Sequence, residues 1–266
     1  MYKGGCHYSS LCAARSALSS SITIPEYNCL SEHPMISRFL KGIYNRHPPT
    51  PKYGEIWDIN TVLKYYEAQK YNKEINMMQL TQKLILLLMI LGSQRKHTLV
   101  TIDAKNVIIE EGKMILLPNK VQKQSRPGKQ ISPIIYHRYP HNQNLCVVNC
   151  MEEYIKRRNL LVNDNVAQLF ITINKPHKPA SNNTIARWIK QELSAAGIDT
   201  SVYKAHSCRS ASSSKAKEVG IPYTQILKRG GWSSDSTFKR FYDKNIIGKN
   251  NEKELDFVTL LLENNI

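Results

Sequence analysis

With 266 residues, of which 41% are hydrophobic, the chain is long enough for one large domain, or a large and a small one, around a packed core, which argues against global disorder. Its 37 Lys and Arg against 21 Asp and Glu give a formal charge of +16, which favours a polyanionic partner because neutralised phosphates release condensed counterions. The longest apolar run, residues 84–91, is too short to span a bilayer, and no signal-peptide pattern opens the sequence. We therefore expect a soluble intracellular protein.

Two short helices are expected before residue 45, at 8–20 and 33–45. The second has an apolar stripe formed by Met35, Ile36, Phe39, Leu40 and Ile43. Three prolines in "NRHPPTPKYG" (45–54) predict a linker, because proline cannot continue a helix. Two helices bury too little surface for an independent domain, so we divide the chain into a small part, 1–52, and a main domain, 53–266.

The main domain combines helical periodicity with a few short β-rich runs. Helices are expected at 58–70, 77–92, 145–161 and 181–197, and again between 203 and 244 with breaks at 219–222 and 229–232. Strands are expected at 98–103, 106–110, 113–118, 131–136 and 169–173. The fold class is α+β: a mostly helical domain with one small sheet.

The cysteines do not form a disulfide framework, and a reducing compartment fits them. His137, His141, Cys146 and Cys150 could be read as a zinc site, but their spacing matches no usual zinc finger. Cys146 and Cys150 are four residues apart on an apolar helix face, so we interpret them as buried thiols. We predict no metal and no cofactor.

Basic residues cluster in two segments. Residues 112–130 hold five Lys or Arg and no acid, and 201–244 hold nine against three acids. Such clustering favours nucleic acid over scattered charge that only aids solubility. The side chains that we expect to contact DNA are Lys120, Arg126, Lys129, Lys204, Lys239 and Arg240.

Several polar residues are ordinary alone but together meet a chemical requirement. Arg95 follows the apolar helix, Lys123 lies in the acid-free turn, and His206 and Arg209 share a helix face by their i, i+3 spacing. Attack on a phosphodiester needs a nucleophile, cations for the non-bridging oxygens and a proton for the leaving oxygen. Two arginines, a lysine and a tyrosine can supply these groups.

The order Arg95, Lys123, His206, Arg209, Trp232, Tyr242 resembles the tyrosine recombinase (phage integrase) family. Five segments look closest to the recombinases of DIRS-type eukaryotic mobile elements: "GSQRKHTLVTID", "VQKQSRPG", "CVVNCMEEYIKRR", "KPHKPASNNTIARWIK" and "GGWSSDSTFKRFYDK". The likeness runs from about residue 9 to residue 247. It implies a mostly helical catalytic domain with a small antiparallel sheet at 53–266, preceded at 1–52 by the last part of a helical core-binding domain and a linker.

The resemblance also implies roles. Arg95 and Arg209 would hold the scissile phosphate, with His206 assisting by proton transfer or phosphate contact. Trp232 would replace a histidine found in many members and donate its indole N–H. Lys123 would protonate the 5′ oxygen, and Tyr242 would form a 3′-phosphotyrosyl link. Duplex DNA and further copies of the chain, as a dimer or tetramer on DNA, would be the partners, and the protein would act in the nucleus.

Three features depart from the family pattern. Thr98 stands where many members have an acid, and Tyr242 follows Trp232 by ten residues, one more than the commonest spacing. The core-binding helices are incomplete, so we expect a truncated copy or an incomplete gene model. The open alternatives are a catalytically inactive DNA-binding remnant and an enzyme similar to type IB topoisomerases.

The nucleophile is predicted from position, because the chain has 14 tyrosines. A short helix capped by one of residues 233–235 would be anchored by Phe238 and Phe241, leaving Tyr242 to face the basic cleft. The tail, 252–266, carries a helical stripe of leucine and valine, for which docking into a neighbouring protomer and packing on its own domain are both open.

Overall fold

The computed structural model describes residues 5–27, 29–48, 50, 52–119, 125, 132–162, 166–232 and 235–248. It forms two compact units, Met1–Lys52 and Tyr53–Ile266. The predicted tail at 252–266 lies outside the described residues. Within the ranges given above, no helix combines the length and apolar character needed to cross a membrane.

The first unit consists of α1 (Tyr8–Ser19), a 3₁₀ turn η2 (Leu30–Glu32) and α2 (Pro34–Arg46). Its core is small: Leu11, Leu40 and Ile43 are buried together. Of the apolar stripe predicted on the second helix, Met35 and Phe39 are exposed instead. The reason is that one facing helix can cover only part of a stripe of that width.

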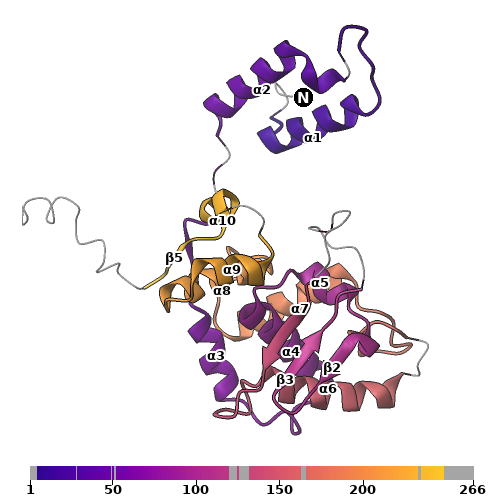
Figure 1. Cartoon of the computed structure of the whole chain (residues 1–266). Coiled ribbons are helices and arrows are strands. Elements are labelled where there is room, and N and C mark those ends of the chain that lie inside the picture. The colour runs from indigo at the N-terminus through magenta and orange to yellow at the C-terminus, as the bar shows by residue number, and fades with distance from the viewer. Residues whose placement is uncertain are drawn as a thin grey trace, which may run out of the picture. The chain divides into compact units, whose positions relative to one another are not determined.

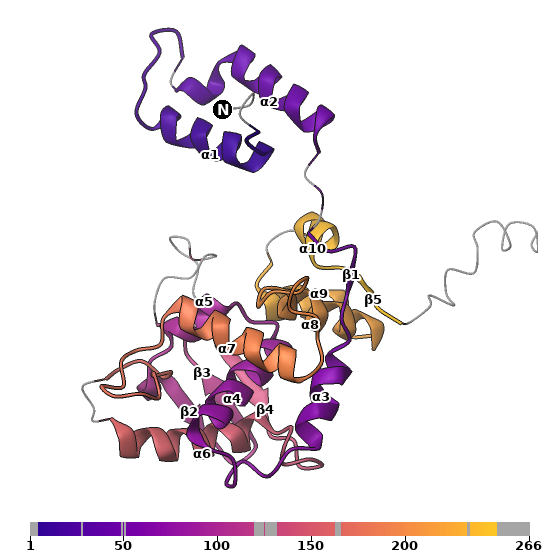
Figure 2. The same ribbon diagram turned by 180° about the vertical axis from the view of Figure 1, so that it is seen from behind.

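The second unit is built around α4 (Met77–Gly92), which is buried on nearly all sides. A helix that is hydrophobic all round must be enclosed by others. It packs against α6 (Val147–Leu161), α7 (Asn182–Ala195) and α8 (Ser207–Glu218), as Figures 1 and 2 show. A capping box between Asn76 and Gln79 starts α4.

A three-stranded antiparallel sheet flanks this helical core, as expected. Its strands are β2 (Val107–Ile109), β3 (Lys113–Leu116) and β4 (Ile134–His137), in that spatial order. Ile108 pairs with Ile115, and Ile115 with Ile135. The sheet follows η3 (Ala104–Asn106).

Two predicted strands are wrong. Residues 98–103 largely belong to a helix, α5 (Lys96–Thr101), whose Thr98, Leu99 and Thr101 are buried at helical spacing against α7. Packing against α7 thus overrides the β propensity of threonine and valine. Residues 169–173 form only an isolated bridge, between Ile171 and Pro179, and the carbonyl of Leu169 accepts from the side chains of Arg158 and Tyr154.

The C-terminal helices follow the predicted breaks. α9 (Tyr223–Gly230) and α10 (Asp235–Phe241) come after α8, with Gly220 and Gly231 at positive φ between them. A pairing that the sequence did not predict joins distant segments: β1 (Glu55–Ile56), just before α3 (Ile59–Glu67), is parallel to β5 (Asn245–Ile246). The residues after α10 are thereby fixed to the start of the unit (Figures 1 and 2).

Candidate active site

Five helices bring five of the six predicted catalytic residues together. The end of α4 leads into Arg95, which is the N-cap of α5, and the start of α8 carries His206 and Arg209. Trp232 follows the left-handed Gly231 at the end of α9, and Tyr242 follows α10. The sixth, Lys123, lies outside the described residues.

Arg209 is the centre of the site and is only 1% exposed. Its Nη1 donates to the carbonyl of Ser93 at 2.5 Å, and its Nη2 donates to the carbonyl of Gly230. The guanidinium lies 3.7 Å from the ring centroid of Trp232 and 5.3 Å from that of Tyr242. Arg209 is therefore enclosed between two aromatic rings and two backbone carbonyls.

Burial lowers the pKa of both Arg209 and Arg95. The pKa of Arg209 is lowered to about 9, mainly by burial and further by the charge of Arg95. Tyr242 acts in the opposite direction and raises it. Burial also lowers the pKa of Arg95, against a raising influence of Tyr242. Two cations held at a desolvated point attract an anion strongly, because the low local dielectric enhances charge interactions.

Tyr242 lies close to both Arg209 and Arg95. Its hydroxyl is 3.3 Å from Nε2 of His206, an exposed residue, and its ring meets Trp232 edge-on at 4.9 Å between centroids. The backbone N–H of Tyr242 donates to the carbonyl of Phe238. A phenol, an imidazole and two guanidinium groups thus converge on one spot.

Trp232 depends on Gly230 for its position. A Cβ at Gly230 would come within 1.8 Å of the indole ring, so only glycine permits the stacking on Arg209. Two buried donors, the indole Nε1 and the Nε of Arg209, have no hydrogen-bond partner among the residues described. Unsatisfied buried donors are costly, so an acceptor that reaches them is bound strongly.

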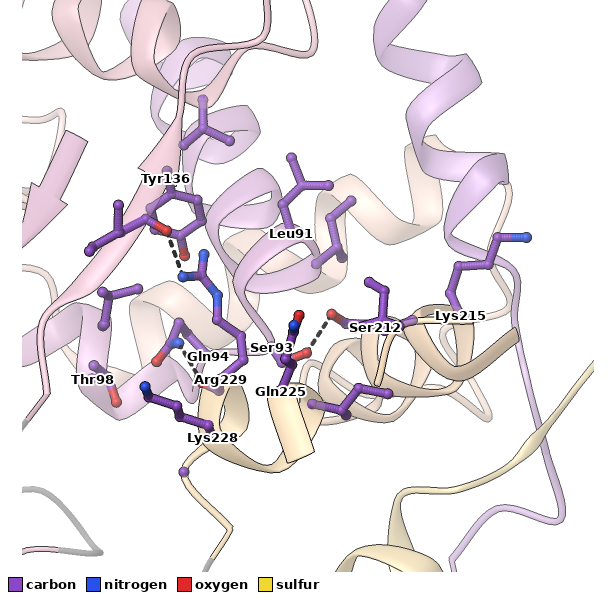
Figure 3. Close-up of a pocket in the computed structure, with 18 of the residues that line it drawn as sticks. Leu91, Ser93, Gln94, Thr98, Tyr136, Ser212, Lys215, Gln225, Lys228 and Arg229 are labelled. Carbon is purple, nitrogen blue, oxygen red and sulfur yellow. Dashed lines mark hydrogen bonds between the residues drawn. The ribbon is translucent and has the colours of Figure 1, made fainter. Parts of the chain in front are cut away.

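A second layer of residues holds the backbone around Arg209. Ser93 ends α4 with a left-handed φ of 50°, and its hydroxyl meets that of Ser212 at 2.6 Å. The Gln94 amide donates to the carbonyls of Gly92 and Arg229. Figure 3 shows these residues lining a pocket between α4, α8, α9 and β4.

Three of the six residues that we predict to contact DNA lie in the described part of the chain. Lys120, Arg126 and Lys129 lie outside the described residues. Lys204 is exposed and its amine donates to two carbonyls, Lys239 pairs with Asp235 at 2.8 Å, and Arg240 is exposed on α10.

The predicted anchoring of α10 is half right. Phe238 is fully buried against Trp232 and Tyr223. Phe241 is 40% exposed, so its predicted burial is wrong. The helix ends at Phe241, and the chain then turns so that Tyr242 faces inward and Phe241 outward.

Sequence reasoning missed the supporting residues. Ser93, Gln94, Ser212 and Gly230 have common residue types and no recognisable motif. The adjacent glycines before Trp232 were the one available signal, because such a pair indicates close approach of a side chain to the backbone.

This fold, a mostly helical domain with a small antiparallel sheet, is that of a tyrosine recombinase catalytic domain. Residues 59–246 match the model of the phage integrase family, and the chain belongs to this family.

Solved structures of recombinases share this fold. The XerH site-specific recombinase bound to difH substrate aligns with a TM-score of 0.57 at 11% identity, covering 90% of this chain and 63% of that one. The Tn1549 transposon integrase (residues 82–397) in complex with circular intermediate DNA gives 0.55 at 14% identity, covering 100% and 81%. XerA recombinase gives 0.51 at 14% identity, covering 98% and 84%. A search of curated proteins returned no match to the sequence.

Proposed function

We propose that the protein is a site-specific DNA recombinase, encoded by a mobile element of the DIRS-like kind, that breaks and rejoins DNA through a 3′-phosphotyrosyl intermediate. The observation that carries the proposal is the position of Tyr242, whose hydroxyl meets His206 above the buried Arg209. Membership of the phage integrase family supports this reading.

The reaction follows from the roles of the side chains. Arg95 and Arg209 bind the non-bridging oxygens of the scissile phosphate and neutralise the charge that grows on them. The phenol oxygen of Tyr242 attacks phosphorus, its proton passes to His206, and the bond to the 5′ oxygen breaks. Lys123 donates a proton to that oxygen, and Trp232 donates its indole N–H to the phosphate. Attack by the 5′ hydroxyl of another strand reverses these steps and releases Tyr242.

One rearrangement accompanies binding. Arg209 is 1% exposed, and the ring of Tyr242 covers it. A phosphate that reaches Arg209 therefore displaces this ring, whereas the half-buried Arg95 is reached first. In the same movement the two unsatisfied donors of Arg209 and Trp232 gain acceptors.

The substrate is duplex DNA and the protein acts in the nucleus as an assembly of its own copies. Exchange between two duplexes needs each broken strand to be held by a tyrosine, so several chains act together. The structural relatives named above include complexes with a difH substrate and with circular intermediate DNA. Residues 1–52 contribute the last part of a core-binding domain, and 53–266 the catalytic domain.

An inactive DNA-binding remnant is the second candidate. The enclosure of Arg209 is the observation in its favour, because an unreachable cation cannot bind phosphate. Against it, Tyr242, His206 and both arginines remain gathered in one site.

The experiment is covalent capture from a pool of nicked suicide duplexes with randomised sequence. The nick lets the cleaved end diffuse away, so a recombinase is trapped on its preferred site. We expect a denaturation-resistant protein–DNA adduct enriched for related sequences. Binding without adduct at any protein concentration would instead identify the remnant.

A further inference from the structure

The chain just after α10 is tied to α8 by side chains that take no part in the proposed chemistry. The hydroxyl of Ser214 donates to the carbonyl of Tyr242 at 3.0 Å and accepts the backbone N–H of Lys244 at 3.0 Å. The amine of Lys217 pairs with the carboxylate of Asp243 at 2.7 Å. The turn that carries the nucleophile is therefore held at the carbonyl of Tyr242 and at the two residues that follow it.

These contacts come from one face of α8. Ser214 and Lys217 are three residues apart, and the neighbouring Ser213 adds a longer contact of 3.4 Å to the carbonyl of Tyr242. Both serines are buried. Serine is not a favoured residue inside a helix, and buried hydroxyls need partners. The hydroxyl of Ser214 has both of its partners in the turn that carries Tyr242, whereas that of Ser213 lies closer to the carbonyl of Arg209 in its own helix, at 2.8 Å. We call Ser214 and Lys217 the α8 clasp.

The same helix carries the phosphate-binding cation. Arg209 lies five residues before Ser214 on α8, which is about 7.5 Å along the axis at 1.5 Å per residue. Because a helix is rigid and Ser214 holds the backbone of Tyr242, α8 alone fixes the distance between the guanidinium of Arg209 and that backbone. Beyond the clasp, the N–H of Ile247 donates to the carbonyl of Ile56 and extends the attachment to β1.

We propose that the α8 clasp assigns Tyr242 to the active site of its own chain and sets its position over Arg209. Ser214 is thus a positioning residue, acting through the backbone of Tyr242. The proposal rests on the proposed function and adds the device by which each copy in an assembly uses its own tyrosine. Without the clasp, the pairing of β5 with β1 still holds the chain from Asn245, but the turn before it can move away from α8 and enter the site of a neighbour.

The first test measures the rate of adduct formation on a captured site. In Ser214→Ala and Asp243→Asn, we expect adduct formation to slow by roughly tenfold to a hundredfold, because small displacements of a reacting group have large kinetic effects. DNA affinity stays at least as high as in the wild type. Asp235→Asn is the matched control: it removes an ion pair of 2.8 Å within α10 and the same charge, and leaves the clasp intact.

The second test asks which chain's tyrosine reacts. Tyr242→Phe chains are mixed with larger, tagged Arg95→Gln chains, so that adduct on the tagged chain requires its tyrosine to enter the other chain's site. With the clasp intact, we expect no more adduct than from Arg95→Gln alone. When the tagged chain also carries Ser214→Ala and Asp243→Asn, adduct on it rises at least tenfold. If the tagged chain forms the same amount of adduct with and without the clasp, the proposal is overturned. Loss of a purely structural contact would not create a reaction in the other chain's site.

A third measurement does not depend on catalysis. Amide hydrogen exchange in the DNA-free protein reports the N–H of Lys244, which the hydroxyl of Ser214 accepts. We expect protection in the wild type and at least tenfold faster exchange in Ser214→Ala, with Asp235→Asn unchanged. Fast exchange in the wild type overturns the clasp even if the protein forms adduct. Protection without adduct supports the clasp while the proposed function fails.

Discussion

Trp232 shows how a single small residue shapes the site. The indole lies against Gly230 and stacks on Arg209, with its edge toward Tyr242. The face of an aromatic ring attracts a guanidinium, which offsets part of the cost of burying that cation. Gly230 also supplies the carbonyl that accepts from Arg209. A side chain at residue 230 should therefore displace both the indole ring of Trp232 and the guanidinium of Arg209.

Gly230→Ala tests this arrangement. The new methyl group would overlap the indole, so we expect Trp232 to leave Arg209 and adduct formation to fall on the order of a hundredfold. The free energy of unfolding should fall by about 1–3 kcal/mol from overpacking. Gly112→Ala, where a Cβ meets nothing within 4 Å, is the control. Wild-type adduct rates in Gly230→Ala would show that the stacking has no part in the reaction.

The convergence of Arg95, His206, Arg209, Trp232 and Tyr242 could be predicted from the sequence, but the enclosure of Arg209 could not. The spacing of His206 and Arg209 on a helix and the order of the other residues indicated which side chains share a site. Whether Arg209 is open or covered depends on how Tyr242 and Trp232 pack, which spacing does not reveal. The same holds for Ser214, whose partner is the backbone of a residue 28 positions away.

At the scale of elements, α3, α4 and α7 share a buried polar cluster. Glu192 accepts a hydrogen bond of 2.8 Å from the hydroxyl of Tyr66, and the amine of Lys83 lies 5.5 Å from the centroid of that ring. Lys83 is fully buried, and its amine has no hydrogen-bond partner in the described part of the chain. Burial raises the pKa of Glu192 and lowers that of Lys83.

The raised pKa of Glu192 predicts a pH dependence of stability. Above the ordinary value of 4.5, the folded chain retains a proton that the unfolded chain has released, so this residue's contribution to stability decreases as pH rises through the raised pKa. Glu192→Gln keeps an acceptor for Tyr66 but does not titrate. In urea unfolding, we expect the wild type to lose stability relative to Glu192→Gln as pH increases from 4.5 toward neutrality. A difference that is constant over this range would refute the assignment.

The long periodic elements and the strands of the three-stranded sheet were predictable, but other short elements were not. The apolar run of α4 and the glycine breaks around α9 are local signals, and both were confirmed. Residues 98–101 carry β-branched side chains, yet packing against α7 makes them helical. The pairing of β1 with β5 joins two-residue segments from opposite ends of the domain, for which no local pattern exists.

At the scale of the whole molecule, the charge of +16 predicts how the protein binds DNA. Affinity should come mainly from phosphate contacts, which position the protein without reading sequence. If six or more phosphates are contacted, raising salt from about 50 mM to about 200 mM should weaken binding to duplex DNA by roughly 10³-fold or more. Fluorescence anisotropy over a salt series measures this slope. Affinity that stays flat across the series would contradict a phosphate-driven interface.

The central claim is that Tyr242 forms the covalent bond to DNA. Its most direct test is to trap the adduct on a suicide duplex with labelled phosphate, digest the protein and locate the label. We predict label on Tyr242 alone, and in Tyr242→Phe normal DNA binding with no adduct. Label on Tyr203 or Tyr223, or adduct that survives in Tyr242→Phe, would contradict the account.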